Sequence, residues 1–250
     1  MQGDIWAHWA WPVATAALGF AFAGLVFRQW WQRRRAHQAA WFVGMLFYAL
    51  AAVMEAWSEY SGSWDPTVYR LYIVLAASLV GFLGLGSLYL VAKRRIWGHL
   101  YLVVVLVCLI VFLGGVFTTD LIEEALVPGI TVGGQALGES MSFPRVMSLP
   151  FNIPGSIFLL GGALLSVFRF MRRKEYAYRA WANVLIASGT ILIAFAGSRA
   201  RLGDTTGLYP AEMVASALLL AGFLKAGTLR KGAREIGEGL RKDHPMDLKD

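Results

Sequence analysis

The chain has 250 residues, of which 57% are hydrophobic and 16% are charged, and its formal net charge is +7. Soluble domains carry about 25% charged residues, so the composition argues against a soluble protein and favours one that crosses a membrane several times. The basic residues lie in short blocks between apolar runs, as topology signals do. They do not form the basic stripe with interleaved aromatic residues that would indicate a nucleic-acid partner.

Long apolar runs separated by polar or basic turns predict an all-α, polytopic membrane protein with a bundle of seven transmembrane helices. Each run approaches the roughly 20 residues that a bilayer requires, and a helix satisfies its own backbone groups in lipid. In chain order, the expected helices cover residues 11–31, 39–60, 67–93, 97–117, 152–171, 178–201 and 208–230. They form a transmembrane domain over residues 1–230, and residues 231–250 form a charged cytoplasmic tail.

Lysine and arginine are unequally divided between the two sides of the predicted bundle. With the N-terminus outside, 19 of the 23 basic residues fall on the inner side, and the outer side holds only Arg70, Arg145, Arg199 and Arg201. Cytoplasmic loops carry the excess of basic residues in membrane proteins. We therefore expect an outer N-terminus, an inner C-terminus and a multi-pass location in the plasma membrane.

Residues 118–150 form the longest stretch expected outside the bilayer. Residues 118–129 are acidic and predict a short helix on the surface, and the Gly-Gly pair within residues 130–137 predicts a small hairpin. A loop of this length is uncommon unless it serves as a lid or a binding loop. The segment is thus either a lid over a site or a packed surface loop.

Charged side chains recur near the outer ends of the predicted helices. A rise of about 1.5 Å per residue places Glu55 roughly one turn below the outer surface, at the level of two other acids and three bases. An unpaired charge in lipid costs about 2.5 kcal/mol or more, so this level is either a binding site or a salt-bridge network that closes the bundle. The candidate binding residues are Glu55, Glu59, Arg70, Tyr72, Asn152, Arg199, Arg201, Tyr209 and Glu212.

Small residues follow the same helix faces toward the inner side, among them Gly84 in the third helix and Gly155 in the fifth. Glycine allows two helix backbones to approach closely. These faces therefore predict tight helix crossings, and they also leave room for a narrow pocket.

The motifs of several functional classes are missing from the sequence. It has no His-Glu-x-x-His, one cysteine (Cys108) and no phosphate-binding loop, so we expect no metal, cofactor or ATP site, and we assign no catalytic residue. The expected function is a ligand-binding sensor or a carrier for a small solute or lipid. Two alternatives stay open: an accessory subunit held by a membrane-protein partner, and, less favoured, an intramembrane enzyme that uses Glu55 or Glu212 but lacks a convincing nucleophile.

Overall fold

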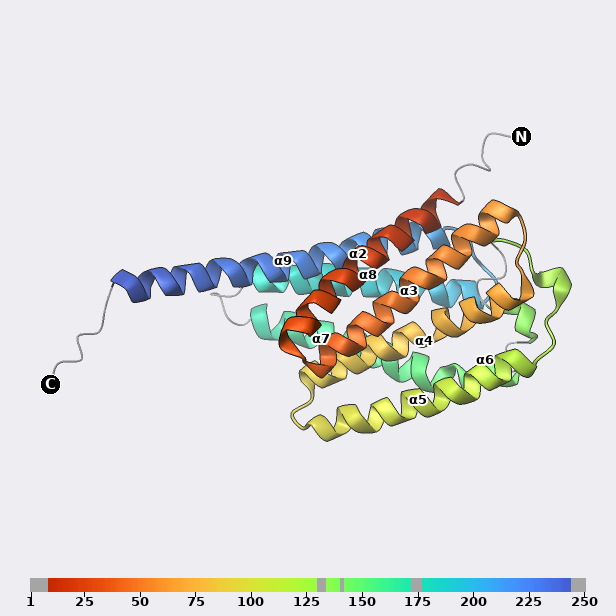
Figure 1. The fold of residues 1–250 in the computed structure, drawn as a ribbon, viewed down its shortest axis with the longest axis horizontal. Coiled ribbons are helices and arrows are strands. Elements are labelled where there is room, and N and C mark those ends of the chain that lie inside the picture. Colours follow the sequence, from red (N-terminus) through yellow and green to blue (C-terminus); the bar gives the residue numbers. More distant parts are fainter. Residues whose placement is uncertain (1–8, 130–133, 140–141, 172–176, 244–250) are drawn as a thin grey trace.

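The computed structural model describes residues 9–129, 134–139, 142–171 and 177–243, and the regular structure within these ranges is entirely helical. This confirms the expected all-α fold. The long helices are α2 (Ala10–Arg33), α3 (Ala36–Ser61), α4 (Pro66–Val91), α5 (Arg95–Thr118), α7 (Leu149–Met171), α8 (Ala177–Arg201) and α9 (Leu208–Asp243) (Figure 1). The described part of the connection between α5 and α7 contains the short turns η1 (Glu123–Ala125), η3 (Gln135–Leu137) and α6 (Phe143–Met147).

Within the described residues, seven helices are long and apolar enough to cross a membrane, as the sequence predicts. The fifth of these spans joins α6 to α7 and covers Phe143–Phe168. The last apolar span ends at Ala226, but α9 continues as one helix to Asp243, past the expected end at residue 230. This extension projects beyond the rest of the bundle (Figure 1).

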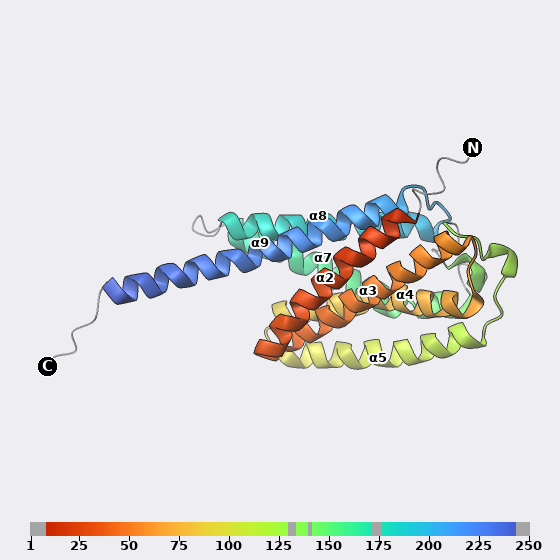
Figure 2. The ribbon, with the colours of Figure 1, turned by 45° about the horizontal axis from the view of Figure 1, so that its top comes forward.

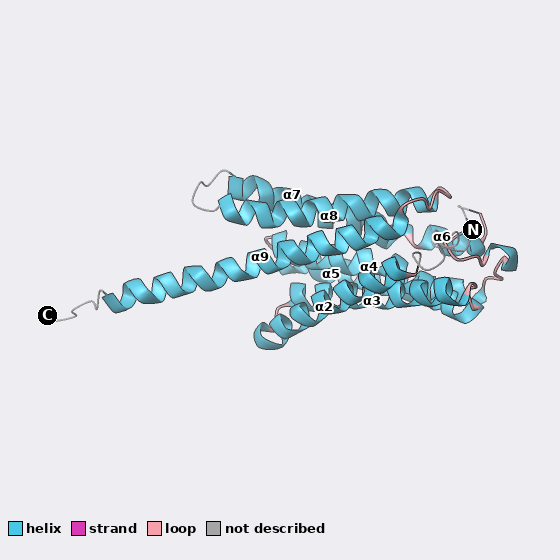
Figure 3. Ribbon diagram, turned by 90° about the horizontal axis from the view of Figure 1, so that it is seen from above, coloured by secondary structure: helices cyan, strands magenta, loops and turns pink. Residues whose placement is uncertain are grey.

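Six of the long helices close a ring in which α2, α3, α4, α7, α8 and α9 each pack against the next, and α9 returns to α2. Seen from above, α7 and α8 lie on one side of α9 and α2 and α3 on the other (Figure 3). The remaining long helix, α5, packs on the outside of the ring against α4 and runs along one edge of the bundle (Figure 2). Its outward face is apolar, with Ile110 70% exposed, as a lipid-facing helix requires.

Glycines set the closest crossings in this ring. A Cβ atom added to Gly84 of α4 would lie 2.4 Å from the Cα atom of Gly155 in α7, so these two backbones touch. A Cβ on Gly189 of α8 would lie 2.8 Å from the carbonyl oxygen of Ala215 in α9. Small residues therefore bring α4 to α7 and α8 to α9 by direct backbone contact.

The turn between α3 and α4 fixes the relative position of two helices that carry candidate site residues. Gly62 ends α3 with a φ of 74°, a left-handed conformation that glycine adopts without strain. Asp65 then caps α4, because its Oδ1 atom accepts hydrogen bonds from the backbone N–H groups of Thr67 (2.8 Å) and Val68 (3.0 Å). Pro66 occupies the first turn, where a missing N–H costs nothing.

The segment between α5 and α7 packs against the ends of the helices. The Gln135 side chain donates a hydrogen bond to the carbonyl of Ala200 (3.0 Å), the Ile122 N–H donates to the carbonyl of Ala136 (2.9 Å), and Leu137 is buried. The acidic stretch forms only the single turn of η1, shorter than the expected surface helix. Of the expected hairpin, residues 130–133 lie outside the described part, and Gln135–Leu137 form the helical turn η3.

Candidate functional site

A cavity of about 520 Å³ lies inside the ring of helices. It is bordered by α3, α4, α7, α8 and α9, with residues of η3 and α6 at the end that the 118–150 segment covers. Most of its wall is aliphatic, from residues such as Met45, Ile73, Leu79 and Leu160. Its polar lining includes Glu55, Tyr72, Asn152 and Glu212. The cavity therefore has the character of a site for a molecule with a long apolar part and a smaller polar part.

Two carboxylic acids from opposite sides of the ring form the centre of the polar part. Glu55 of α3 is only 2% exposed, and it is hydrogen-bonded to Glu212 of α9 and receives a hydrogen bond from the Tyr72 hydroxyl of α4. All three residues line the cavity. A hydrogen bond between two carboxyl groups needs a hydrogen on one of them, so the bonded pair carries at most one negative charge. Three of the predicted residues thus meet at one point.

Tyr48 ties α3 to the first turns of α9. Its hydroxyl lies within hydrogen-bonding distance of the backbone carbonyl of Glu212 (3.0 Å) and of Oγ of Ser216 (2.8 Å). The Ser216 Oγ atom donates to the same carbonyl (2.6 Å). Tyr48 and Glu55 lie two turns apart on one face of α3, and Glu212 and Ser216 one turn apart on α9. This spacing directs both acids into the same part of the cavity.

A second pair of predicted residues, Glu59 and Tyr209, lies one turn nearer the helix ends. The Tyr209 hydroxyl donates to a carboxylate oxygen of Glu59 at 2.7 Å. Neither residue lines the cavity. They connect the end of α3 to the start of α9, beside the carboxyl pair.

Asn152 lines the cavity from α7, together with Arg145 of α6. The Asn152 side chain donates to the carbonyl of Ser148 (2.9 Å), one turn back in the chain. Arg145 is buried and donates to the carbonyl of Gly138 (3.0 Å), which holds its guanidinium beneath the loop. Arg145 is absent from the candidate set predicted from the sequence, because its position depends on the path of the 118–150 segment. The sequence marked Arg145 only as one of the four basic residues on the side of the bundle that was expected to hold few basic residues.

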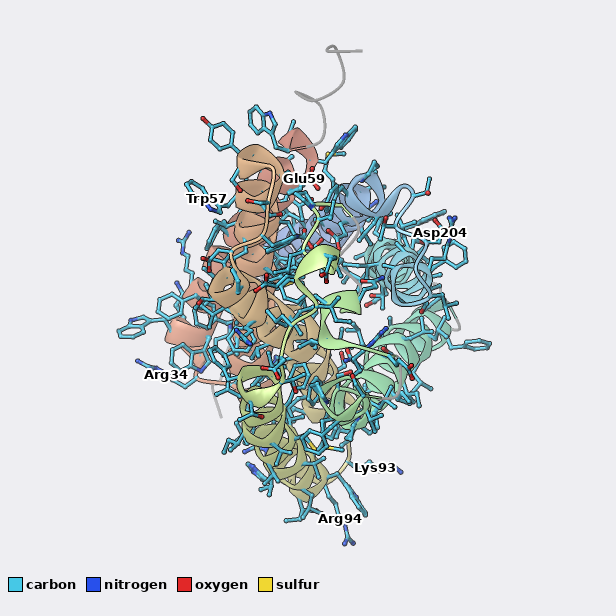
Figure 4. The ribbon with its side chains drawn as sticks, turned by 90° about the vertical axis from the view of Figure 1, so that its right-hand side faces the viewer. Arg34, Trp57, Glu59, Lys93, Arg94 and Asp204 are labelled. Atoms are coloured by element: carbon cyan, nitrogen blue, oxygen red, sulfur yellow. The ribbon has the colours of Figure 1, made fainter. Side chains whose placement is uncertain are left out.

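Arg70 and Arg199 do not line the cavity. Arg70 donates to the carbonyls of Val116 (3.2 Å) and Thr119 (3.0 Å), so it satisfies the C-terminal end of α5, where free carbonyls and the helix dipole favour a cation. Arg199 pairs with Asp204, and these side chains are 43% and 46% exposed. Asp204 lies at the rim of the bundle, well apart from Glu59 (Figure 4). The Arg201 side chain lies outside the described part of the chain.

The Arg199–Asp204 pair orders the turn between α8 and α9, and Asp204 lies outside the membrane-spanning segments. Hydrogen bonds from the Arg199 guanidinium and from Thr206 lower the pKa of Asp204. A lowered pKa means that this contribution to stability is complete above about pH 4 and is lost as the pH falls through the folded-state value. We expect Asp204→Asn to lower the thermal unfolding midpoint slightly at neutral pH, because exposed pairs contribute little. Melts across a pH series should show the difference from the unsubstituted protein vanish in acid, and a difference that grows in acid would contradict this role.

The described residues include no group of three His, Cys, Asp or Glu side chains that could hold a metal ion. Comparisons with protein-family models, with curated proteins and with solved structures find no match. The geometry of the cavity is therefore the basis for assigning a function.

Proposed function

We propose that this protein binds a small amphiphilic molecule in the cavity and acts as a membrane sensor or carrier for it. The observation that carries the proposal is a cavity of about 520 Å³ with aliphatic walls and a buried pair of carboxyl groups, Glu55 and Glu212. Cavities that bury small ligands occupy about 300–1,000 Å³, and they have mostly apolar walls with a few convergent polar groups. This cavity has both properties.

The Glu55–Glu212 pair favours a ligand with a hydrogen-bond-donating, cationic head. Arg199 forms an ion pair with Asp204, and neither Glu55 nor Glu212 takes part in it. A buried carboxylate is stabilised by an opposite charge and by hydrogen bonds. An ammonium group placed between the two acids supplies both, and the aliphatic wall accommodates the rest of the molecule.

The same proposal includes an outer N-terminus, an inner C-terminus and a place in the plasma membrane. The basic ends of α2 and α4 lie at the end of the bundle from which α9 projects, and the 118–150 segment lies at the other end (Figure 1). That arrangement agrees with the positive-inside rule. Under it, the carboxyl pair faces the outer half of the membrane.

The continuous helix α9 favours a sensor over a carrier. Glu212 lies in the first turns of α9, and the helix passes through the membrane and on to Asp243 without interruption. A helix is a rigid element, so a displacement where the ligand meets Glu212 is carried to the inner end. A sensor needs such a connection, whereas a carrier needs two alternating openings.

A glycine substitution that fills the cavity tests the proposed function. Gly197 of α8 lines the cavity, and a Cβ atom added to it meets no heavy atom within 4 Å. We expect Gly197→Leu to fold normally and to weaken binding of tritiated dodecylamine, a long-chain ammonium probe, by tenfold or more. Scintillation proximity on the purified protein in lipid nanodiscs measures the binding.

Gly161→Leu in α7 is the matched control. Gly161 also has no heavy atom within 4 Å of an added Cβ, but it does not line the cavity. Both substitutions replace a helical glycine by leucine and gain similar helix propensity, about 0.8 kcal/mol. We expect the control to bind like the unsubstituted protein. If the unsubstituted protein binds no more dodecylamine than Gly197→Leu does, the proposed function is wrong.

A further inference from the structure

We propose that the ligand reaches the cavity sideways from the bilayer, through a gap between the outer halves of α7 and α8, and that it is therefore a lipid-dissolved, long-chain cation rather than a water-soluble one. This inference rests on the proposed function, since it names the class of ligand and its route to the same cavity.

The evidence is that several residues line the cavity and are exposed on the outside of the bundle at the same time. In α7 these are Ile153 and Ile157, which are 54% and 62% exposed. In α8 they are Ala194 and Ser198, which are also exposed. Each pair is one turn apart and so shares a helix face. A residue with both properties lies at a mouth of the cavity, and all four belong to membrane-spanning segments.

The packing of the two helices explains why they leave this gap. The backbone contact between Gly155 and Gly84 holds α7 against α4, and the contact between Gly189 and Ala215 holds α8 against α9. Each helix is thus drawn toward a neighbour on its far side. The side that α8 turns to the gap is built from small residues, Ala194, Gly197 and Ser198, which cannot fill the space between the helices.

The end of the bundle that faces the outer water is more closely covered. Ala136 and Leu137 are buried over the helix ends, and the Gln135 side chain is hydrogen-bonded to the carbonyl of Ala200 at the end of α8. Arg145 is buried beneath the same segment. The described residues of the segment therefore act as a cover, while the exposed mouth faces the hydrocarbon.

The chemistry of the cavity agrees with this route. An ion that enters from water needs a polar path. The mouth is lined by Ile153, Ile157, Ala194 and Ser198, and the Ser198 hydroxyl is bonded to the Ala194 carbonyl, so the mouth suits an alkyl chain. The Glu55–Glu212 pair, with Tyr72 beside it, lies deeper and attracts a cationic head. A molecule that dissolves in the bilayer with its ammonium group at the outer interface can slide its head to the acids while its chain stays in an apolar environment.

A bulky residue at the mouth tests the route. We expect Ala194→Trp, in nanodiscs, to slow both the association and the dissociation of tritiated dodecylamine by about tenfold, measured by dilution with unlabelled amine. Substituting a residue that only contacts the bound ligand would weaken binding and speed dissociation. Slower dissociation would therefore show that Ala194 lies at the entrance of the cavity. Ile191→Trp, at an exposed α8 position that does not line the cavity, is the matched control and should exchange normally. Ile157→Trp narrows the gap from the α7 side, and its effect on the exchange of dodecylamine is a second, independent test of the route.

The chain length of the probe tests the ligand class in the same assay. Tritiated butylamine has the same head but stays in water, and we expect it to bind at least a hundredfold more weakly than dodecylamine. Unchanged exchange rates in both mouth variants, or equal binding of butylamine, would overturn the lateral route while leaving the proposed function intact. If the unsubstituted protein shows no dodecylamine binding that is lost in Gly197→Leu, the proposed function itself is wrong.

Discussion

Replacing Gly84 with valine is expected to destabilise the bundle by about 3 kcal/mol. The added Cβ atom would lie 2.4 Å from both the Cα and the carbonyl oxygen of Gly155. These are backbone atoms, so no side chain can rotate away, and α4 and α7 must separate. That separation would also disturb the cavity wall that these two helices share. Thermal unfolding followed by intrinsic tryptophan fluorescence in detergent measures the loss.

Gly24→Val controls for the intrinsic cost of a β-branched residue in a helix. Gly24 lies on an exposed part of α2, and an added Cβ there meets no heavy atom within 4 Å. The substitution is therefore expected to change stability only by the difference in helix propensity between the two residues. That difference is a few tenths of a kcal/mol in favour of valine. If the two variants unfold at the same temperature, α4 and α7 do not meet at Gly84 and the arrangement of the ring is wrong.

Replacing Glu55 with glutamine is expected to weaken dodecylamine binding by at least tenfold and to leave the fold intact. Glutamine keeps the shape of the side chain and can still accept the hydrogen bond from Tyr72, but it leaves Glu212 as the single carboxyl group of the pair, and the glutamine N–H group competes with an ammonium head for that carboxylate. Equilibrium binding in nanodiscs measures the change. Thermal unfolding of the same sample shows whether the fold is kept.

The matched control removes an acidic charge elsewhere at the same end of the bundle. Glu123 lies in η1 and is exposed, so Glu123→Gln changes the net charge by the same amount without touching the cavity. We expect it to bind like the unsubstituted protein. Equal loss of binding in both variants would mean that long-range attraction, rather than the carboxyl pair, holds the probe. Normal binding by Glu55→Gln would exclude Glu55 as part of the site.

The positions of the helices along the chain were accessible from the sequence because the bilayer imposes a length on each apolar run. The expected helix at residues 178–201 corresponds to α8 (Ala177–Arg201), and the others agree within a few residues at most ends. The end of α9 was misplaced. Charged residues beyond Arg230 mark the limit of the apolar span, but they do not stop a helix.

The partners of the charged residues were harder to predict, for a geometric reason. Counting residues along a helix gives the depth of a side chain, but not the direction in which it points. Glu55, Tyr72 and Glu212 share both depth and direction and meet at the cavity. Arg70 has a similar depth, but it turns outward to the end of α5, which packs outside the ring. That contact depends on the order of the helices in space.

Two further features depend on local or irregular structure. Arg199 finds its partner five residues along the chain, in Asp204, because the short turn before α9 brings them together. Arg145 reaches the cavity through the packing of the 118–150 segment, and no periodic pattern describes such a path. Sequence patterns in this chain thus locate the membrane spans and the acids, but not the groups that loops supply.

A crystal structure of the protein grown in lipid with 12-bromododecylamine would show whether a long-chain ammonium compound occupies the cavity. Anomalous scattering locates the bromine, which marks the end of the alkyl chain. We expect a bromine peak in the cavity or at its mouth between α7 and α8, and density for the ammonium group beside Glu55 and Glu212. A cavity filled by protein side chains, or bromine found only on the outer surface of the bundle, would contradict it.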